Sequence, residues 1–250
     1  MKKIIEYFDH AYVINLQDRH DRRRQAESEF QRIGIDLPGK KVDFFTAVRP
    51  TDSGNFQNVG VRGCFNSHRS VLQLADQKNL RNVLVFEDDV CFRDVGALFE
   101  NRLLAKLDHE DWDLIFFGYL KPDDQALTGP LVLWPEDILG AHFYAVNGRF
   151  IRTMIRYMND CEQRPRDHPQ GGPMVPDGAY NHIRYLDPDI KLLLSVPSLA
   201  HQRNSRTDVA PRRFFDEIVW LRQMIIGMRS IKSRIRMVAD RRKLRRQLDQ

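Results

Sequence analysis

The sequence predicts an α/β protein in which helices flank a mainly parallel sheet. Over the first 160 residues, short apolar runs alternate with segments of helical periodicity, as in chains built from repeated strand and helix units. The clearest run, residues 83–86, is apolar at every position, which is typical of a strand covered on both faces. With 250 residues, 42% of them hydrophobic, the chain is long enough to bury one sizeable core.

The strands are expected where a short apolar run ends at a polar or turn-forming residue. The first run ends at Asn15, the fourth is stopped by Gly118, and the last comes just before Pro197. In chain order the predicted strands cover residues 11–14, 44–48, 82–86, 114–117, 142–146 and 191–196.

The helices are expected where apolar residues recur with a period of 3.6. Asn66 or Ser67 is predicted to cap the second helix, because a short polar side chain accepts a hydrogen bond from the first turn. A loop with four prolines, residues 164–176, separates the last two helices. The predicted helices cover residues 21–33, 66–75, 95–107 and 148–158, and a short one begins near Asp177.

The net charge of +5 is unevenly distributed along the chain. Residues 212–250 hold 12 Lys and Arg against 4 Asp and Glu, so this segment carries +8 and the remainder carries −3. We therefore expect an α/β domain over residues 1–211 and a basic helical C-terminal extension over residues 212–250. The extension has apolar residues at helical spacing, so it either packs on the domain or binds an anionic membrane surface.

Several classes of protein are disfavoured because their targeting or cofactor-binding motifs do not occur in the sequence. We expect no membrane span and no secretory leader, because the apolar runs are far shorter than either requires. The three cysteines have no zinc-finger spacing and are expected to be reduced thiols of a cytoplasmic protein. No Walker A loop, dinucleotide fingerprint or nucleophile elbow occurs in the sequence.

Three acids follow the clearest strand and form the first candidate site. Glu87, Asp88 and Asp89 would lie at the carboxyl edge of the sheet, where α/β proteins bind ligands. Carboxylates there suit Mn²⁺ or Mg²⁺ bridging to a phosphate, although the same acids would also make a solvated turn.

Arginines and a histidine form the second set of candidates. Arg19 and Arg22 follow the first strand, and arginine binds phosphate through two parallel hydrogen bonds. Cys64 and His68 are interpreted as a packed pair in the core, since free cysteine is usually buried.

Taken together and in this order, the segments resemble glycosyltransferase family 25, the bacterial lipopolysaccharide and capsule sugar transferases. The resemblance spans roughly residues 11–208. Its segments are V-I-N-L from Val13, F-T-A-V from Phe45, G-C-F-N-S-H from Gly63, V-F-E-D-D-V from Val85, D-W-D-L-I-F-F-G from Asp111 and G-A-H-F-Y-A-V from Gly140.

The resemblance implies a GT-A fold, a UDP-sugar donor, most often UDP-galactose, a divalent cation, and inversion at the anomeric carbon. It implies that Mn²⁺ or Mg²⁺ is held by Glu87 and Asp89. His201, just past the last predicted strand, would be either a third ligand or an ordinary loop histidine. The donor pocket would be lined by Asn15, Leu16, Arg19, Arg22, Ser67, His68 and Asp88.

Asp177 is the predicted catalytic base, because it lies beyond the loop at 164–176 in a segment that matches the family. It would equally suit the start of a helix. The implied acceptor is a glycan of lipopolysaccharide, capsule or a related surface glycoconjugate. The chain would then work in the cytoplasm, at the inner face of the membrane if the extension binds lipid.

Other functions remain open on the sequence alone. A nucleic-acid-binding protein would use the basic extension, but no basic surface interleaved with aromatic residues supports that interpretation. A sugar nucleotidyltransferase would need a Gly-rich basic segment near the first strand, which is absent here. An inactive sugar-binding homologue is disfavoured by the intact acid cluster.

Overall fold

The structure is a computed structural model that describes residues 1–120 and 129–203. The chain divides into two units, Met1–Arg206 and Thr207–Gln250, and the described residues all lie in the first. The predicted boundary after residue 211 and the predicted basic helix of residues 212–250 fall outside the described residues. Within the described part, no helix combines the length and the apolar character needed to cross a membrane.

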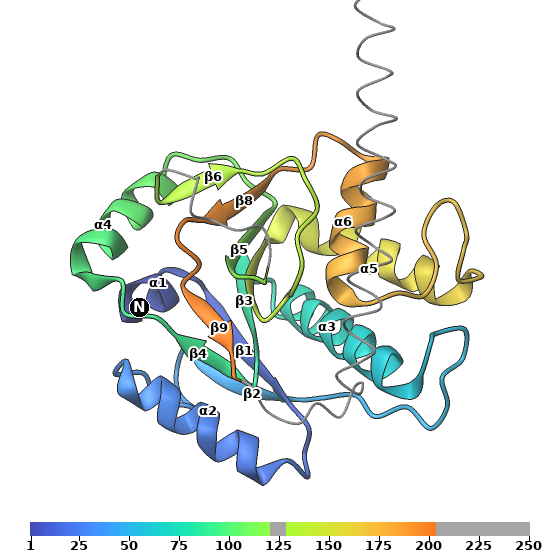
Figure 1. Cartoon of the computed structure of the whole chain (residues 1–250), viewed down its shortest axis with the longest axis horizontal. Helices are drawn as coiled ribbons and strands as arrows, with labels where there is room; N and C mark the ends of the chain where they lie inside the picture. The colour runs from blue at the N-terminus through green and yellow to red at the C-terminus, as the bar shows by residue number, and fades with distance from the viewer. Residues whose placement is uncertain (121–128, 204–250) are drawn as a thin grey trace, which may run out of the picture. The chain divides into compact units, whose positions relative to one another are not determined.

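Helices and strands alternate through most of the first unit (Figure 1). The helices are α1 (Lys2–Tyr7), α2 (His20–Arg32), α3 (Val59–Gln77), α4 (Gly96–Leu107), α5 (Gly148–Gln163) and α6 (Pro176–Leu186). The strands are β1 (His10–Asn15), β2 (Val42–Thr46), β3 (Asn82–Glu87), β4 (Val90–Phe92), β5 (Leu114–Gly118), β6 (Leu131–Leu133), β7 (Phe143–Asn147), β8 (Leu192–Ser195) and β9 (Ala200–Gln202).

The central sheet has the strand order β2-β1-β3-β7-β5-β8-β6. Pairings β2 with β1, β1 with β3 and β5 with β8 are parallel, whereas β7 is antiparallel to both its neighbours and β6 is antiparallel to β8. Five of these seven strands therefore point the same way. The predicted α/β class with a mainly parallel sheet is confirmed.

Helices cover both faces of the sheet (Figure 1). On one face, α1, α2 and α4 pack over a core in which the ring of Phe30 meets that of Phe86 edge-on at 5.1 Å. On the other face, beneath α3, α5 and α6, the Tyr144 ring lies 5.4 Å from Phe116 and 5.1 Å from Tyr180. Buried aromatic pairs of this kind add about 0.5–1.5 kcal/mol each beyond the area that they bury.

Helix α3 begins seven or more residues earlier than the sequence predicted. Asn58 is its N-cap, and its side chain accepts a hydrogen bond from the Val61 amide at 2.9 Å. The expected caps, Asn66 and Ser67, lie inside the helix, so the G-C-F-N-S-H segment offers no free amides to a phosphate. Two glycines, Gly60 and Gly63, weakened the helix prediction here.

Gly63 and Ser67 attach α3 to the chain that leaves β2. The Ser67 hydroxyl donates to the Gly63 carbonyl at 2.6 Å and accepts from the Val48 amide at 2.8 Å. A Cβ on Gly63 would come within 2.8 Å of the Val48 carbonyl oxygen, so only glycine permits this approach. The hydroxyl of Ser67 is thus already bonded to the protein backbone.

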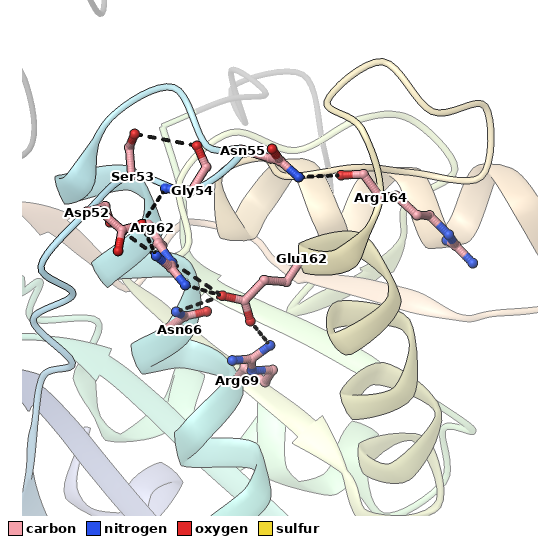
Figure 2. Close-up of polar contacts among 9 residues, drawn as sticks. All are labelled: Asp52, Ser53, Gly54, Asn55, Arg62, Asn66, Arg69, Glu162 and Arg164. Carbon is pink, nitrogen blue, oxygen red and sulfur yellow. Dashed lines mark hydrogen bonds and ion pairs between the residues drawn. The ribbon is translucent and has the colours of Figure 1, made fainter.

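A second contact joins α3 to α5 through Glu162 (Figure 2). Its Oε1 accepts from Arg62 and Asn66 at 3.3 Å, and its Oε2 accepts from Arg69 at 2.5 Å. The three donors lie at i, i+4 and i+7 on one face of α3. Arg62 also donates to Asp52 Oδ1 at 2.5 Å, so this arginine links the loop before α3 to Glu162.

Replacing this carboxylate should therefore destabilise the fold. For Glu162→Gln we expect a loss of about 1–3 kcal/mol in the free energy of unfolding in urea at neutral pH, because Arg69 and Arg62 both lose the charge of Glu162 and Arg62 keeps only its pair with Asp52 among the described residues. The arginines hold the pKa of Glu162 below its usual value against the opposing effect of burial. This stabilisation is present above the unfolded pKa and disappears as the pH falls, so the two proteins should converge in acid.

Glu27→Gln is the matched control for this measurement. Glu27 lies on α2 and pairs only across the surface with Arg23 at 3.3 Å, an interaction worth less than about 1 kcal/mol. Equal losses of unfolding free energy in the two variants would contradict the role assigned to Glu162.

Candidate active site

The acid cluster lies where β1 and β3 end side by side. Ile14 is the register partner of Glu87, so Asn15 and Asp88 follow at the same edge of the sheet. Asp88 Oδ2 accepts from Asn15 at 2.8 Å, and Asp88 Oδ1 accepts from Arg22 of α2 at 2.9 Å. The structure thus brings together three of the residues predicted for the donor pocket.

Asp89 is the least compensated acid of the cluster. Asp89 is 7% exposed, and its Oδ1 atom is buried without a hydrogen-bond partner among the residues that the structure describes. Burial, reinforced by the negative charges of Glu87 and Asp88, raises the pKa of Asp89 to about 7. A buried carboxylate oxygen without a partner is costly, and a cation beside it would offset that cost.

Glu87 is held between two elements. Its Oε2 accepts from Gln202 of β9 at 2.7 Å, and its Oε1 lies 3.6 Å from Nε2 of His68 on α3. Burial alone would raise the pKa of Glu87, but His68, His142 and Gln202 together lower it. Of Glu87 and Asp89, Glu87 is therefore the acid that stays ionised at neutral pH.

His68 is fixed by two buried tyrosines. Its Nδ1 lies 2.8 Å from the Tyr144 hydroxyl, the two rings stack at 5.7 Å, and Tyr180 donates to Tyr144 at 2.9 Å. Burial raises the pKa of both tyrosines, so they stay neutral. This arrangement aims Nε2 of His68 toward Glu87.

Cys64 and His68 belong to the site, and the prediction of a simple core pair is incomplete. The ligand atoms of Cys64, His68 and Glu87 all lie within 4.8 Å of one another. Among the described residues this is the group of three such side chains close enough to hold a metal ion. Burial, together with the charges of Glu87, Asp177 and Asp89, raises the pKa of the Cys64 thiol well above its usual value.

His142 is a member of the site that the sequence did not reveal. It is fully buried just before β7, its Nε2 lies 3.4 Å from the Ala200 carbonyl, and its own carbonyl accepts from the Glu87 amide at 3.0 Å. Burial lowers the pKa of His142. Because β7 runs antiparallel to β3, the start of β7 lies beside the carboxyl end of β3. In a fully parallel sheet, the start of β7 would lie at the opposite edge.

Asp177 is the second residue of α6, and its carboxylate already binds backbone amides. Oδ2 accepts from the Gly140 amide at 3.0 Å, and Oδ1 accepts from the Gly178 amide at 2.8 Å. Its charge, after burial and the charge of Glu87, contributes to the raised pKa of the Cys64 thiol. The role of base stays a prediction.

The remaining predicted site residues are His201, Arg19 and Leu16. His201 lies in β9, rather than past the last strand as expected, opposite Cys91 and exposed. It does not form a close group with Glu87 and Asp89 in the described part of the chain. Arg19 donates twice to Asp21 at about 3 Å, and Leu16 follows directly on β1.

Comparison with known proteins finds similarity over a little less than half of the chain. The sequence model of glycosyltransferase family 25 (LPS biosynthesis protein) matches residues 8–123. A glycosyltransferase 25 family member of Aedes aegypti is 32% identical over 143 residues, which cover 46% of this chain and 22% of that protein. Procollagen galactosyltransferase 1-B of Xenopus laevis is 29% identical over 135 residues, which cover 44% and 21%.

Other relatives extend the comparison. An inactive glycosyltransferase 25 family member 3 of Mus musculus is 32% identical over 142 residues, covering 48% of this chain and 24% of that protein. These matches span about a quarter or less of each curated relative. A solved glycosyltransferase involved in glycosylation of the major capsid of PBCV-1 aligns with 79% of this chain and 94% of its own, at 10% identity and a TM-score of 0.49.

The matched residues include the acid cluster, Asn15, Arg22 and the whole of α3, whereas His142, Asp177 and His201 lie beyond them. Residues 8–123 are therefore similar to glycosyltransferase family 25, over somewhat less than half of the chain.

Proposed function

We propose that this protein transfers a hexose, galactose in the first instance, from a UDP-sugar to a hydroxyl group of a glycan acceptor, with inversion at the anomeric carbon. The observation that carries the proposal is Asp89, which lies beside two further carboxylates at the ligand-binding edge of the sheet. Its buried Oδ1 has no hydrogen-bond partner in residues 1–120 and 129–203. A relative named procollagen galactosyltransferase supports galactose as the sugar.

A divalent cation fits this cluster. The ligands would be Glu87 and Asp89, since carboxylate oxygens suit Mn²⁺ and Mg²⁺ and the mutual repulsion of the acids favours a cation. When bound, such an ion would hold the donor diphosphate and stabilise the charge that develops on the leaving UDP. His201 as a third ligand stays a prediction, because among the described residues it forms no close group with these two acids.

The remaining residues of the edge would bind and orient the donor. Burial raises the pKa of Asp88, and Asn15 and Arg22 partly oppose that effect and fix its carboxylate, which would accept hydrogen bonds from ribose or sugar hydroxyls. Arg19 and Leu16 continue the same edge toward the nucleotide. His68 orients Glu87 and would lie beside the donor, while the bonds of Ser67 to Val48 and Gly63 fix the helix that carries it.

The acceptor half of the proposal involves Asp177, as the base that removes the hydroxyl proton. We propose a glycan acceptor of lipopolysaccharide, capsule or a related glycoconjugate, handled in the cytoplasm at the inner face of the membrane. The basic segment of residues 212–250 would then contact anionic lipid headgroups.

The proposal is tested by UDP release from the full-length protein with a panel of UDP-sugars, with Mn²⁺, Mg²⁺ or EDTA. We expect UDP-galactose to give the fastest release, and EDTA to reduce it at least about 100-fold, because the diphosphate would lose the cation that holds it. Calorimetric titration with UDP separates binding from turnover. No binding and no turnover with every nucleotide sugar would contradict the proposal, and would group this chain with its relatives named inactive.

A further inference from the structure

The G-C-F-N-S-H segment of α3 consists of two pairs, each spaced i to i+4. Gly63 and Ser67 hold the chain beside Val48, so their role is to dock the helix. Cys64 and His68 lie about 100° further round the helix and present a thiol and an imidazole on one face. The same spacing carries two metal ligands on one helix face in known metalloenzymes.

Glu87 supplies a third donor atom from a different element. It ends β3, and its Oε1 lies 3.6 Å from Nε2 of His68, close to the separation of two ligand atoms around a tetrahedral zinc ion, roughly 3.3–3.6 Å. The Sγ atom of Cys64 lies within 4.8 Å of both other ligand atoms. An adjustment of roughly 1 Å would complete a three-ligand site.

An independent observation points to a ligand at this position. His68 is 1% exposed, yet within the described part of the chain its Nε2 atom has no hydrogen-bond partner, while Nδ1 is fixed by Tyr144. Metal-binding histidines are held in the same way, by a hydrogen bond to the nitrogen that does not bind the metal. The Tyr144 hydroxyl can accept from Nδ1 as well as donate to it, so Nε2 can be free to coordinate.

We propose that Cys64, His68 and Glu87 form a binding site for a thiophilic divalent cation of the zinc class. The donor set of thiolate, imidazole and carboxylate is one that Zn²⁺ prefers, whereas Mn²⁺ and Mg²⁺ prefer oxygen. The site differs in chemistry from the cation proposed for the donor diphosphate and shares only Glu87 with it. The fourth position is left for water, as in zinc sites with three protein ligands.

Cobalt(II) titration of the full-length, reduced protein tests the proposal without any nucleotide sugar, so its result is independent of the transfer activity. We expect one equivalent of Co²⁺ to produce a thiolate-to-cobalt charge-transfer band in the near ultraviolet. Zn²⁺ should displace the cobalt and abolish the band, while excess Mg²⁺ should leave it unchanged.

The chain has three cysteines, so each is a possible source of the band. Cys64→Ser should abolish it, whereas Cys91→Ser and Cys161→Ser are matched controls that should retain it. Glu87→Gln should keep the band but weaken Co²⁺ binding at least about tenfold. Circular dichroism establishes that each variant is folded.

Several results would overturn the proposal. They are no band with the wild-type protein at saturating Co²⁺, a band that persists in folded Cys64→Ser, and displacement of Co²⁺ by Mg²⁺. Loss of the band in Cys91→Ser alone would instead place the cation at Cys91 and His201, which face each other across β4 and β9, and would also refute the proposed site.

Discussion

Asp89→Asn should reduce sugar transfer at least about 100-fold while it makes the metal-free protein more stable at neutral pH. Loss of transfer follows from the loss of a charged ligand for the cation, a contribution worth several kcal/mol of transition-state stabilisation. The gain in stability follows from the burial of this carboxylate beside Glu87 and Asp88. An asparagine keeps the shape of the side chain without the charge.

The sign of the pH dependence follows from the raised pKa. With a pKa of about 7 when folded and 3.8 as the ordinary value, Asp89 binds its proton more tightly in the folded state. Its contribution to the free energy of unfolding is therefore favourable in acid and is lost as the pH rises toward 7. Above that pH the wild-type protein should be less stable than Asp89→Asn by about 1–4 kcal/mol.

The measurement is urea unfolding in EDTA at about pH 5 and about pH 8, paired with UDP release in Mn²⁺. Asp36→Asn is the matched control, since Asp36 is exposed in the connection from α2 to β2, at the opposite edge of the sheet. It should change neither quantity appreciably. Near-wild-type transfer by Asp89→Asn with metal present would exclude Asp89 as a ligand, whatever its effect on stability.

The acid cluster was predictable because each of its signals is local. An unbroken apolar run predicts the buried strand β3, and acids that follow such a strand must lie at its carboxyl end. Asn15 follows β1 in the same way, and the pairing of β1 with β3 brings it to Asp88. Two local rules and one parallel pairing are therefore enough to predict this half of the site.

His142 could not be placed by the same rules, because its position depends on the direction of β7. The repeated alternation of strand and helix favours parallel strands, but the connection from β5 to β7 carries no helical pattern. The lack of helical periodicity in that stretch of the sequence was the available signal, since parallel neighbours need a long crossover and antiparallel ones do not. Because β7 is antiparallel to β3, the start of β7 lies beside the carboxyl end of β3 and brings His142 and Tyr144 to the site. A parallel β7 would begin at the opposite edge of the sheet.

The role of Cys64 was hidden for a different reason. The i to i+4 spacing of Cys64 and His68 is visible in the sequence, but a pair on one helix face is usually packed in a core. Only the packing of α3 against β3 and β7 adds Glu87 and Tyr144, and that packing depends on contacts such as Gly63 with Val48 and Glu162 with three side chains of α3. These contacts join residues distant in sequence, and no local pattern predicts them.

Asp177→Asn should lower kcat by about 10²–10⁴-fold, with the KM for the donor changed only a few-fold. The asparagine oxygen can still accept one of the two backbone hydrogen bonds that Asp177 makes, to Gly140 and Gly178, so the start of α6 should be largely retained. What the variant loses is a group able to take the acceptor proton.

Kinetics and stability together separate the two roles of this carboxylate. A base that acts in the enzyme–substrate complex gives kcat a rising limb with pH, and that limb should be absent in Asp177→Asn. A residue that only stabilises the helix start would instead cost about 1 kcal/mol of unfolding free energy and leave the pH profile of kcat intact. Because both oxygens of Asp177 already accept amide hydrogens, a base here must give up one of these bonds as it takes the proton. A kcat within about fivefold of the wild type, with an unchanged pH profile, would show that Asp177 only stabilises the start of α6 and is not the base.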